Sequence, residues 1–267
     1  MKTYFKSIIP YSIPRNIFAA MFVILAMVVF TLSNGCNDDT TASNTYGQIS
    51  MTGQYSSSNS PSNTPTTMMK HSGVSETSVI DSLKITRARF VIRDIKFKTQ
   101  SDSSMFRATP FVLELNLTSA MQEMSVANVP YGTYRKIEFD VHRINANEAA
   151  TLSPVEQTQF QDFLAGDTFS IIISGSTYTN GVSAAFTFRS RLNVKQKLDM
   201  SPEIIINHPS PAVNATMLVS SGGWFRSSTG ALLDPTDSTN ENAISDNLRT
   251  SIKVFKDDNK DGSKDSN

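Results

Sequence analysis

The sequence predicts a mainly β protein, an antiparallel β-sandwich with two short peripheral helices. Along several segments apolar residues alternate with polar ones, which is typical of strands with one dry face and one wet face. Asn180-Gly181 precedes the longest of these segments, and both residues favour the tight turn of a hairpin. Two other segments carry apolar residues at helical spacing instead.

Alternation predicts the strands in order along the chain. A first strand is expected over 48–55, followed by the stretch 83–97, where the apolar positions switch parity twice. A slip of one residue moves every later side chain to the opposite face, so the switches predict β-bulges or a strand that changes partners. Further strands are expected over 111–117, 137–141, 184–199, 203–207 and 213–219. Glu138 and His142 are expected to face outward from the 137–141 strand.

Two segments predict the helices. Ser153-Pro154-Val155-Glu156 has the order of a capping box with Pro at the first helical position, and Gly166 is suited to end this helix. The second helix begins near 238–241, and its apolar residues recur at helical spacing from Ile244 to Phe255. Both helices are expected to pack on the β-sandwich.

The N-terminal segment has the order of an export signal. Basic residues come first, at Lys2, Lys6 and Arg15. An uncharged apolar run over 17–32 follows, and then Ser33-Asn34-Gly35 leads to Cys36, the only cysteine. The run has about 16 residues, fewer than the roughly 20 that a membrane-spanning helix needs. The alternative is an uncleaved signal anchor with an incidental cysteine.

The end of this segment resembles the lipobox of bacterial lipoproteins. The resemblance implies a signal peptide over 1–35 and acyl chains on Cys36, which becomes the first mature residue. Each buried methylene contributes about 0.8 kcal/mol, so two or three chains would hold the protein firmly at a membrane. The chain departs from the lipobox at Ser33, where Leu, Val or Ile is usual.

The residues after the cysteine refine the expected location. Asn37-Asp38-Asp39 resembles the surface-export signal of lipoproteins in Bacteroidota and related Gram-negative groups, although a solvated tether has the same composition. The expected location is the outer membrane, lipid-anchored, with the domain periplasmic or surface-exposed. Residues 36–75 are expected to form a flexible tether apart from the strand at 48–55. The β-sandwich is assigned to 76–256 and an acidic tail to 257–267.

Charge and motifs narrow the function classes. The chain has 24 basic and 24 acidic residues, and removing 1–35 takes away three basic residues, which leaves a net charge of −3. Without a basic excess, nucleic acid is not an expected partner. The three histidines (His71, His142 and His208) lack ligand spacing, and there is no His-Glu-x-x-His, phosphate loop or nucleophile elbow. We therefore expect no enzymatic activity; the expected partners are the membrane, an envelope protein or a glycan.

The acidic tail has the order of a calcium loop. Oxygen ligands stand at alternate positions, and Gly262 occupies the turn position. The usual Glu at position 12 is missing, because that position falls after Asn267. The alternative is a solvated charged tail. The expected calcium ligands are Asp257, Asn259, Asp261, Ser263 and Asp265.

The single tryptophan offers a second candidate site. An exposed Trp224 would be a platform on which sugars stack. A tryptophan beside a phenylalanine at a strand start, as Trp224-Phe225 is, more often packs in a core.

The segment 129–139 (VPYGTYRKIEF) looks like the P-x-G-x-Y strand entry of prealbumin-like sandwich domains in bacterial lipoproteins. The block 85–97 is similar to the preceding strand of those domains, and the resemblance covers 82–219. It implies a β-sandwich and an envelope location, and those domains mostly have no assigned function. The expected function is a lipid-anchored cell-envelope protein with a non-enzymatic binding or structural role. The alternative is a carbohydrate-binding or adhesin-like surface module ordered by calcium.

Overall fold

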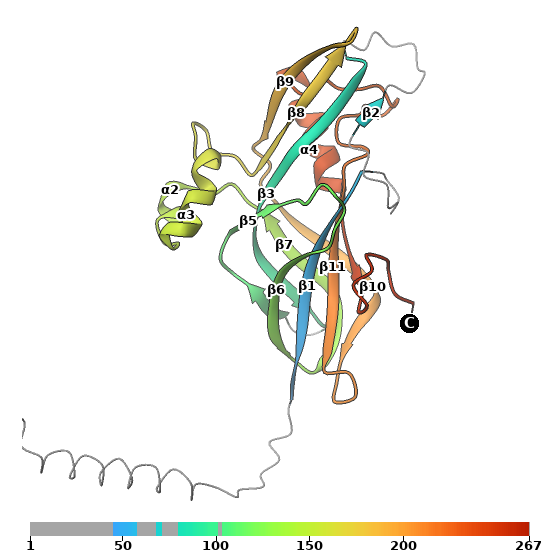
Figure 1. Cartoon of the computed structure of the whole chain (residues 1–267). Helices are drawn as coiled ribbons and strands as arrows, with labels where there is room; N and C mark the ends of the chain where they lie inside the picture. The colour runs from blue at the N-terminus through green and yellow to red at the C-terminus, as the bar shows by residue number, and fades with distance from the viewer. Residues whose placement is uncertain (1–44, 58–67, 71–79, 101–102, 267) are drawn as a thin grey trace, which may run out of the picture. The chain divides into compact units, whose positions relative to one another are not determined.

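Two β-sheets and short peripheral helices form the part of the chain that the computed structural model describes, residues 45–57, 68–70, 80–100 and 103–266 (Figure 1). The signal peptide, Cys36 and His71 lie outside these residues. The strands are β1 (Tyr46–Ser56), β2 (Met68–Lys70), β3 (Ser82–Lys98), β4 (Ser103–Arg107), β5 (Phe111–Glu114), β6 (Gln122–Pro130), β7 (Gly132–Val141), β8 (Ile171–Thr179), β9 (Val182–Ser190), β10 (Val194–Ile206), β11 (Ala212–Ser220) and β12 (Ile252–Lys256). The helices are α2 (Ala146–Ala149), α3 (Pro154–Phe160) and α4 (Glu241–Thr250).

The sandwich pairs a four-stranded sheet with a larger one. The smaller sheet has the order β12-β11-β1-β6, and the larger has the path β10-β7-β3-β8-β9 with β2, β4 and β5 paired to β3. The strand pairs are antiparallel except β1 with β11, which is parallel. The strand predicted over 48–55 lies within β1, in the middle of the smaller sheet. Strand β1 therefore belongs to the sandwich, although it precedes the range 76–256 that was assigned to the sandwich from the sequence.

Strand β3 runs through the larger sheet and explains the parity switches in 83–97. Its register shifts between Ile85 and Arg87 and again between Arg93 and Lys96, which confirms the predicted bulges. Asp94, inside the second bulge, has a positive φ of 54°. β3 also changes partners, pairing with β8 up to Phe90 and with β7 from Ile92. In the path β10-β7-β3-β8-β9, the long strand β3 thus pairs with β8 along its first part and with β7 along its second part.

The hairpin predicted at Asn180-Gly181 joins β8 to β9, and both residues have positive φ, 50° and 79°. The single strand predicted over 184–199 is wrong. The chain leaves the sheet at 191–193, and β9 pairs with β8 whereas β10 pairs with β7 at the other end of the sheet. The same apolar parity continues across the break, so the pattern alone could not reveal it. The strand predicted over 203–207 is the end of β10.

The described residues form three short α-helices: the two that the pattern predicted, found as α3 and α4, and α2 in addition. The capping box before α3 is present: Ser153 N donates to Glu156 Oε2 (3.0 Å), and Glu156 N donates to Ser153 Oγ (3.4 Å). Helix α4 ends at Thr250, so its predicted continuation to Phe255 is wrong; those residues form β12. Helix α2, with four residues, is too short for a helical pattern to show.

The core lies between the sheets and is rich in aromatic rings. Tyr134 OH donates to Pro130 O (2.7 Å), which ties the start of β7 to the end of β6 within the P-x-G-x-Y segment. The largest fully buried aromatic side chains are Trp224, Tyr55, Tyr134, Phe90, Phe97, Phe139, Phe160, Phe163 and Phe225.

No helix in the described ranges combines the length and apolar character needed to cross a bilayer.

Candidate functional site

The C-terminal loop is anchored by one buried carboxylate. Asp257 follows β12 and is completely buried, although aspartate is seldom buried without partners. Its Oδ2 accepts hydrogen bonds from Thr216 Oγ1 (2.6 Å) and from Gly262 N (3.1 Å), and its Oδ1 accepts one from Asp261 N (3.0 Å). The carboxylate therefore joins the loop to β11 and closes the loop upon itself.

A polar network on β1 and β11 supports this anchor. Asn214 Nδ2 donates to the backbone oxygen of Asp257 (3.0 Å) and to Thr52 Oγ1 (3.0 Å), and the hydroxyls of Thr52 and Thr216 lie 2.8 Å apart. Ser50 Oγ donates to Asn214 Oδ1 (2.8 Å). These side chains lie on the face opposite to the core residues of the two strands. The loop covers this face, and the polar side chains of Thr52, Asn214 and Thr216 are paired there.

The rest of the loop has the turn that the calcium pattern requires. Gly262 has φ +79°, and a Cβ there would overlap the side-chain amide of Gln54, so both conformation and space favour glycine. Asp261 accepts hydrogen bonds from Ser263 N (2.7 Å) and Asn259 Nδ2 (2.8 Å). The bond from the Ser263 backbone, and then the one from Asn259, lower the pKa of Asp261 below its usual value. Asp265 Oδ2 accepts from Asp258 N (2.7 Å).

The expected calcium ligands thus lie in one loop. The side-chain oxygens of four of them already accept hydrogen bonds from protein groups: Asp257, Asn259, Asp261 and Asp265. Within the described residues, no group of three or more His, Cys, Asp or Glu side chains is placed to hold a metal ion. Calcium binding stays a prediction of the sequence pattern, since an ion would have to displace hydrogen bonds within the loop.

Isothermal titration calorimetry of the full-length protein tests this prediction. Because the bidentate Glu of position 12 is missing, we expect a dissociation constant of about 10⁻⁴–10⁻³ M, the weak end of calcium loops. An Asp261→Asn variant should lose most of the heat of calcium binding. Asp199→Asn, at an exposed position of β10, should keep it. The absence of heat at millimolar calcium would end the calcium hypothesis.

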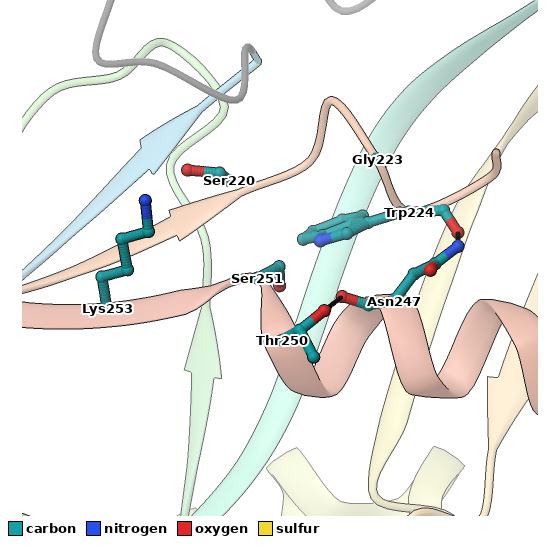
Figure 2. A pocket seen from close by; sticks show the side chains of 7 residues that line it. All are labelled: Ser220, Gly223, Trp224, Asn247, Thr250, Ser251 and Lys253. Atoms are coloured by element: carbon teal, nitrogen blue, oxygen red, sulfur yellow. Dashed lines mark hydrogen bonds between the residues drawn. The ribbon is translucent and has the colours of Figure 1, made fainter. Parts of the chain in front are cut away.

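Trp224 lies in the core and lines a cavity (Figure 2). Its side chain is fully buried, with its ring centroid 6.4 Å from that of Tyr55 and 5.8 Å from that of Phe90. The ring is therefore not an exposed platform for sugars, and core packing is the correct interpretation. Asn247 Nδ2 holds the segment in place by donating to the backbone oxygens of Trp224 (3.1 Å) and Arg226 (2.7 Å).

The cavity beside Trp224 has a volume of about 240 Å³. It lies where α4 ends and β11 and β12 begin to pair, and its lining includes Ser220, Ser251 and Lys253. The indole Nε1 of Trp224 is buried, and no described residue is its hydrogen-bond partner. An unmet buried donor costs about 1–3 kcal/mol, so this nitrogen is an exception that calls for an explanation.

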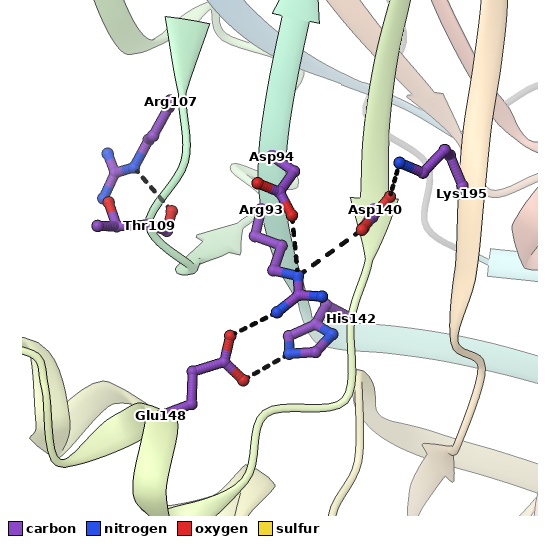
Figure 3. A network of polar contacts seen from close by, with 8 residues as sticks. All are labelled: Arg93, Asp94, Arg107, Thr109, Asp140, His142, Glu148 and Lys195. Carbon is purple, nitrogen blue, oxygen red and sulfur yellow. Dashed lines mark hydrogen bonds and ion pairs between the residues drawn. The ribbon is translucent and has the colours of Figure 1, made fainter. Parts of the chain in front are cut away.

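A partly buried ionic network joins α2 to the larger sheet, and the sequence pattern missed it (Figure 3). His142, expected to face outward, is only 7% exposed, and its Nε2 lies 2.6 Å from Glu148 Oε2. Arg93 Nη1 donates to the other oxygen of Glu148 (2.7 Å). Helix α2 carries Glu148 onto the strand face that alternation assigned to solvent. Asn145, which caps α2 by accepting from Glu148 N, was the available signal.

Glu138 departs from the same expectation. It is 8% exposed, and its Oε1 lies 3.1 Å from Lys98 Nζ and 3.7 Å from Lys197 Nζ. Lysines on the neighbouring strands β3 and β10 cover this carboxylate with their stems while keeping their charges near it. Alternation predicts which face of the sheet a side chain lies on, but the long lysine side chains of the neighbouring strands determine how much of Glu138 is exposed.

Glu148 is expected to make stability depend on pH. Burial raises its pKa, but the hydrogen bonds from His142 and Arg93 outweigh burial and leave the pKa below the usual 4.5. A lowered carboxylate pKa contributes stability that is complete above pH 4.5 and is lost as the pH falls through the folded-state value. In urea unfolding between pH 3 and 7, Glu148→Gln should be less stable than the original chain by about 1–3 kcal/mol at pH 7.

The difference between the two chains should shrink as the pH falls below 4.5 and through the lowered folded-state pKa of Glu148, because the original side chain then becomes neutral as well. Glu203→Gln, which removes an exposed partner of Arg135, is the matched control and should change stability little at any pH. A difference that stayed constant down to pH 3 would contradict the assignment.

A third cluster lies between β3, β5 and the 3₁₀ turn Gln161–Phe163 that follows α3. Arg89 Nη2 donates to Asp162 (2.6 Å), and its guanidinium lies 5.1 Å from the centre of the Phe163 ring. Arg87 binds both oxygens of Glu114, at 2.9 and 2.6 Å. Each arginine faces a carboxylate, so the charges cancel within the cluster. The arrangement fastens α3 to the sheet.

Comparison with known proteins adds no assignment to these sites. No protein-family model, no curated protein and no solved structure matches this chain.

Proposed function

We propose that this chain is a lipid-anchored protein of the cell envelope with a non-enzymatic binding or structural role. The observation that carries the proposal is the order of the N-terminal segment, in which basic residues, an apolar run and Gly35 lead to the single Cys36. Acyl chains on Cys36 would hold the β-sandwich at the outer membrane, on its periplasmic or outer side. A folded domain that begins at β1, ten residues after Cys36, is in keeping with such an anchor.

The resemblance to prealbumin-like domains of lipoproteins supports the same placement. The hydrogen bond from Tyr134 OH to Pro130 O gives the P-x-G-x-Y segment a structural reason, since it fixes the turn at which β7 begins. The non-enzymatic part of the proposal is supported by the pairing of the titratable clusters. The ring of His142, which is 7% exposed, is held by Glu148 and is not presented to a substrate.

Mass spectrometry of the membrane fraction tests the anchor. In a Gram-negative host that processes lipoproteins, the first mature peptide is expected to begin at Cys36 and to carry the mass of the acyl chains. A Cys36→Ser variant should keep residues 1–35 and carry no acyl mass, because the acylated thiol is missing. An original chain with an intact, unacylated N-terminus would refute the proposal.

The second candidate function is a carbohydrate-binding or adhesin-like surface module. The cavity at Trp224 favours it, because this cavity combines a buried, unpaired donor with polar side chains. A glycan array, probed with and without calcium, separates the two candidates. Binding of a glycan in either condition favours the surface module, and the absence of any binding favours the structural role.

A further inference from the structure

We propose that the cavity beside Trp224 binds a small hydroxycarboxylate, with Lys253 and the indole N–H of Trp224 as donors to its carboxylate. Three elements build the cavity: the end of β11 with the loop to Trp224, the end of α4, and the start of β12. This inference deepens the proposed binding role by naming a site and a ligand class. It replaces stacking on the tryptophan ring by a hydrogen bond at the ring's edge.

The unpaired indole nitrogen is the first step of the argument. Trp224 is fully buried, and its Nε1 finds no acceptor among the residues that the structure describes. In Figure 2 the nitrogen lies on the edge of the indole that faces Ser251, which also lines the cavity. An indole N–H can only donate, so it requires an acceptor atom from a ligand that enters the cavity.

The charge of the lining is the second step. Lys253, on β12, is the one charged residue among those that line the cavity, and within the described residues its ammonium forms no ion pair closer than 4.0 Å. An ammonium and a donor-only indole in the lining of one cavity favour an anionic acceptor over a neutral one. A carboxylate has two oxygens, so it can accept from both groups at once.

The hydroxyl groups at the end of α4 supply hydrogen-bond acceptors to the cavity. Ser251 Oγ donates to Leu248 O (2.7 Å), and Thr250 Oγ1 donates to Asn247 O (3.1 Å). With their hydrogens turned to the helix carbonyls, both oxygens are left as acceptors towards the cavity. These bonds also satisfy the last carbonyls of the helix, so Lys253 is not needed as their partner. A ligand hydroxyl next to the carboxylate would donate to Ser251 or Thr250.

The size of the cavity limits the ligand. Sites for drug-sized molecules measure roughly 300–1,000 Å³, and this cavity of about 240 Å³ is smaller. It suits a single hydroxy acid or one acidic sugar residue. D-glucuronate is a suitable probe, because D-glucose differs from it only at C6, where a CH₂OH group stands in place of the carboxylate.

The chain's single tryptophan makes the site directly observable. The full-length ¹⁵N-labelled protein, held in detergent, gives one indole N–H cross-peak in a two-dimensional NMR spectrum. We expect sodium glucuronate to move this peak in a saturable manner, and glucose at equal concentration and ionic strength to leave it unmoved. Lys253→Gln should weaken the binding of glucuronate at least tenfold.

Lys84→Gln, at an exposed lysine on β3, is the matched control and should bind glucuronate as the original chain does. The proposal is overturned if the indole peak does not move, if glucose moves it as far as glucuronate does, or if Lys253→Gln binds as tightly as the original. Those results concern only this cavity. Failure of the anchor is detected separately, by the mass of the N-terminal peptide.

Discussion

Replacement of Asp257 by Ala is expected to lower the free energy of unfolding by about 3 kcal/mol. The carboxylate is fully buried and accepts hydrogen bonds from Thr216, Asp261 and Gly262. Hydrogen bonds to charged groups contribute about 1.5–3 kcal/mol each, but they are not additive within one network. The variant would leave two buried donors, the Thr216 hydroxyl and the Gly262 N–H, without this acceptor, and the C-terminal loop would lose its attachment to β11.

Urea unfolding followed by the fluorescence of Trp224 measures this loss, with a chelator present to exclude calcium. Asp199→Ala is the matched control, because the side chain of Asp199 is 82% exposed and its pair with Lys136 spans 3.5 Å. Exposed pairs contribute about 0–1 kcal/mol, so this control should be close to the original chain. If Asp257→Ala were equally stable, the loop would not be anchored by this carboxylate.

Strand positions could be predicted wherever one face of a strand meets the core and the other meets polar surroundings. β1 shows this clearly, since Ile49, Met51 and Tyr55 are buried in alternation along it. The bulges of β3 were equally visible, because each displaced the apolar parity by one residue. The break between β9 and β10 was not visible, because the parity continued across it.

The segment after α4 shows where a local pattern is ambiguous. Ile252 and Phe255 continue the helical spacing of Ile244 and Leu248, yet they belong to β12. The five residues of β12 pair with β11 from Ala215 to Val219, a partner more than thirty residues away in the chain. Pairing with a strand already in the sheet overrides a weak local preference, and this partner cannot be read from the segment itself.

The candidate sites also combine features that the local sequence predicts with features that depend on distant parts of the chain. The spacing of the C-terminal loop predicted its turn at Gly262, because that requirement is local. It did not predict that Asn214 and Thr216 would meet Asp257, since β11 brings them there from about forty residues away. Likewise, alternation placed His142 on a wet face, and only helix α2 in its folded position shows that Glu148 covers it. Contacts between distant elements decide burial, and one sequence does not reveal them.

The second large effect is expected for Trp224→Ala, which should cost about 3–5 kcal/mol of stability. The fully buried indole packs against Tyr55 and Phe90, so its removal leaves a cavity between the two sheets as well as removing apolar contacts. An exposed stacking platform would behave differently, because its replacement would change stability by about 0.5 kcal/mol or less. Urea unfolding followed by circular dichroism measures the difference, since the variant has no tryptophan to observe.

Two further variants separate the ring from its N–H group. Trp224→Phe keeps an aromatic ring in the core and removes a donor that has no partner in the described part of the chain, so it should cost clearly less than Trp224→Ala. Val155→Ala, at a helix position that is 74% exposed, should be nearly neutral. The expected order of stability is therefore the original chain and Val155→Ala first, then Trp224→Phe, and Trp224→Ala last. If Trp224→Phe were as unstable as Trp224→Ala, the indole nitrogen would have a stabilising partner within the fold, and the donor assigned to the cavity ligand would already be in use.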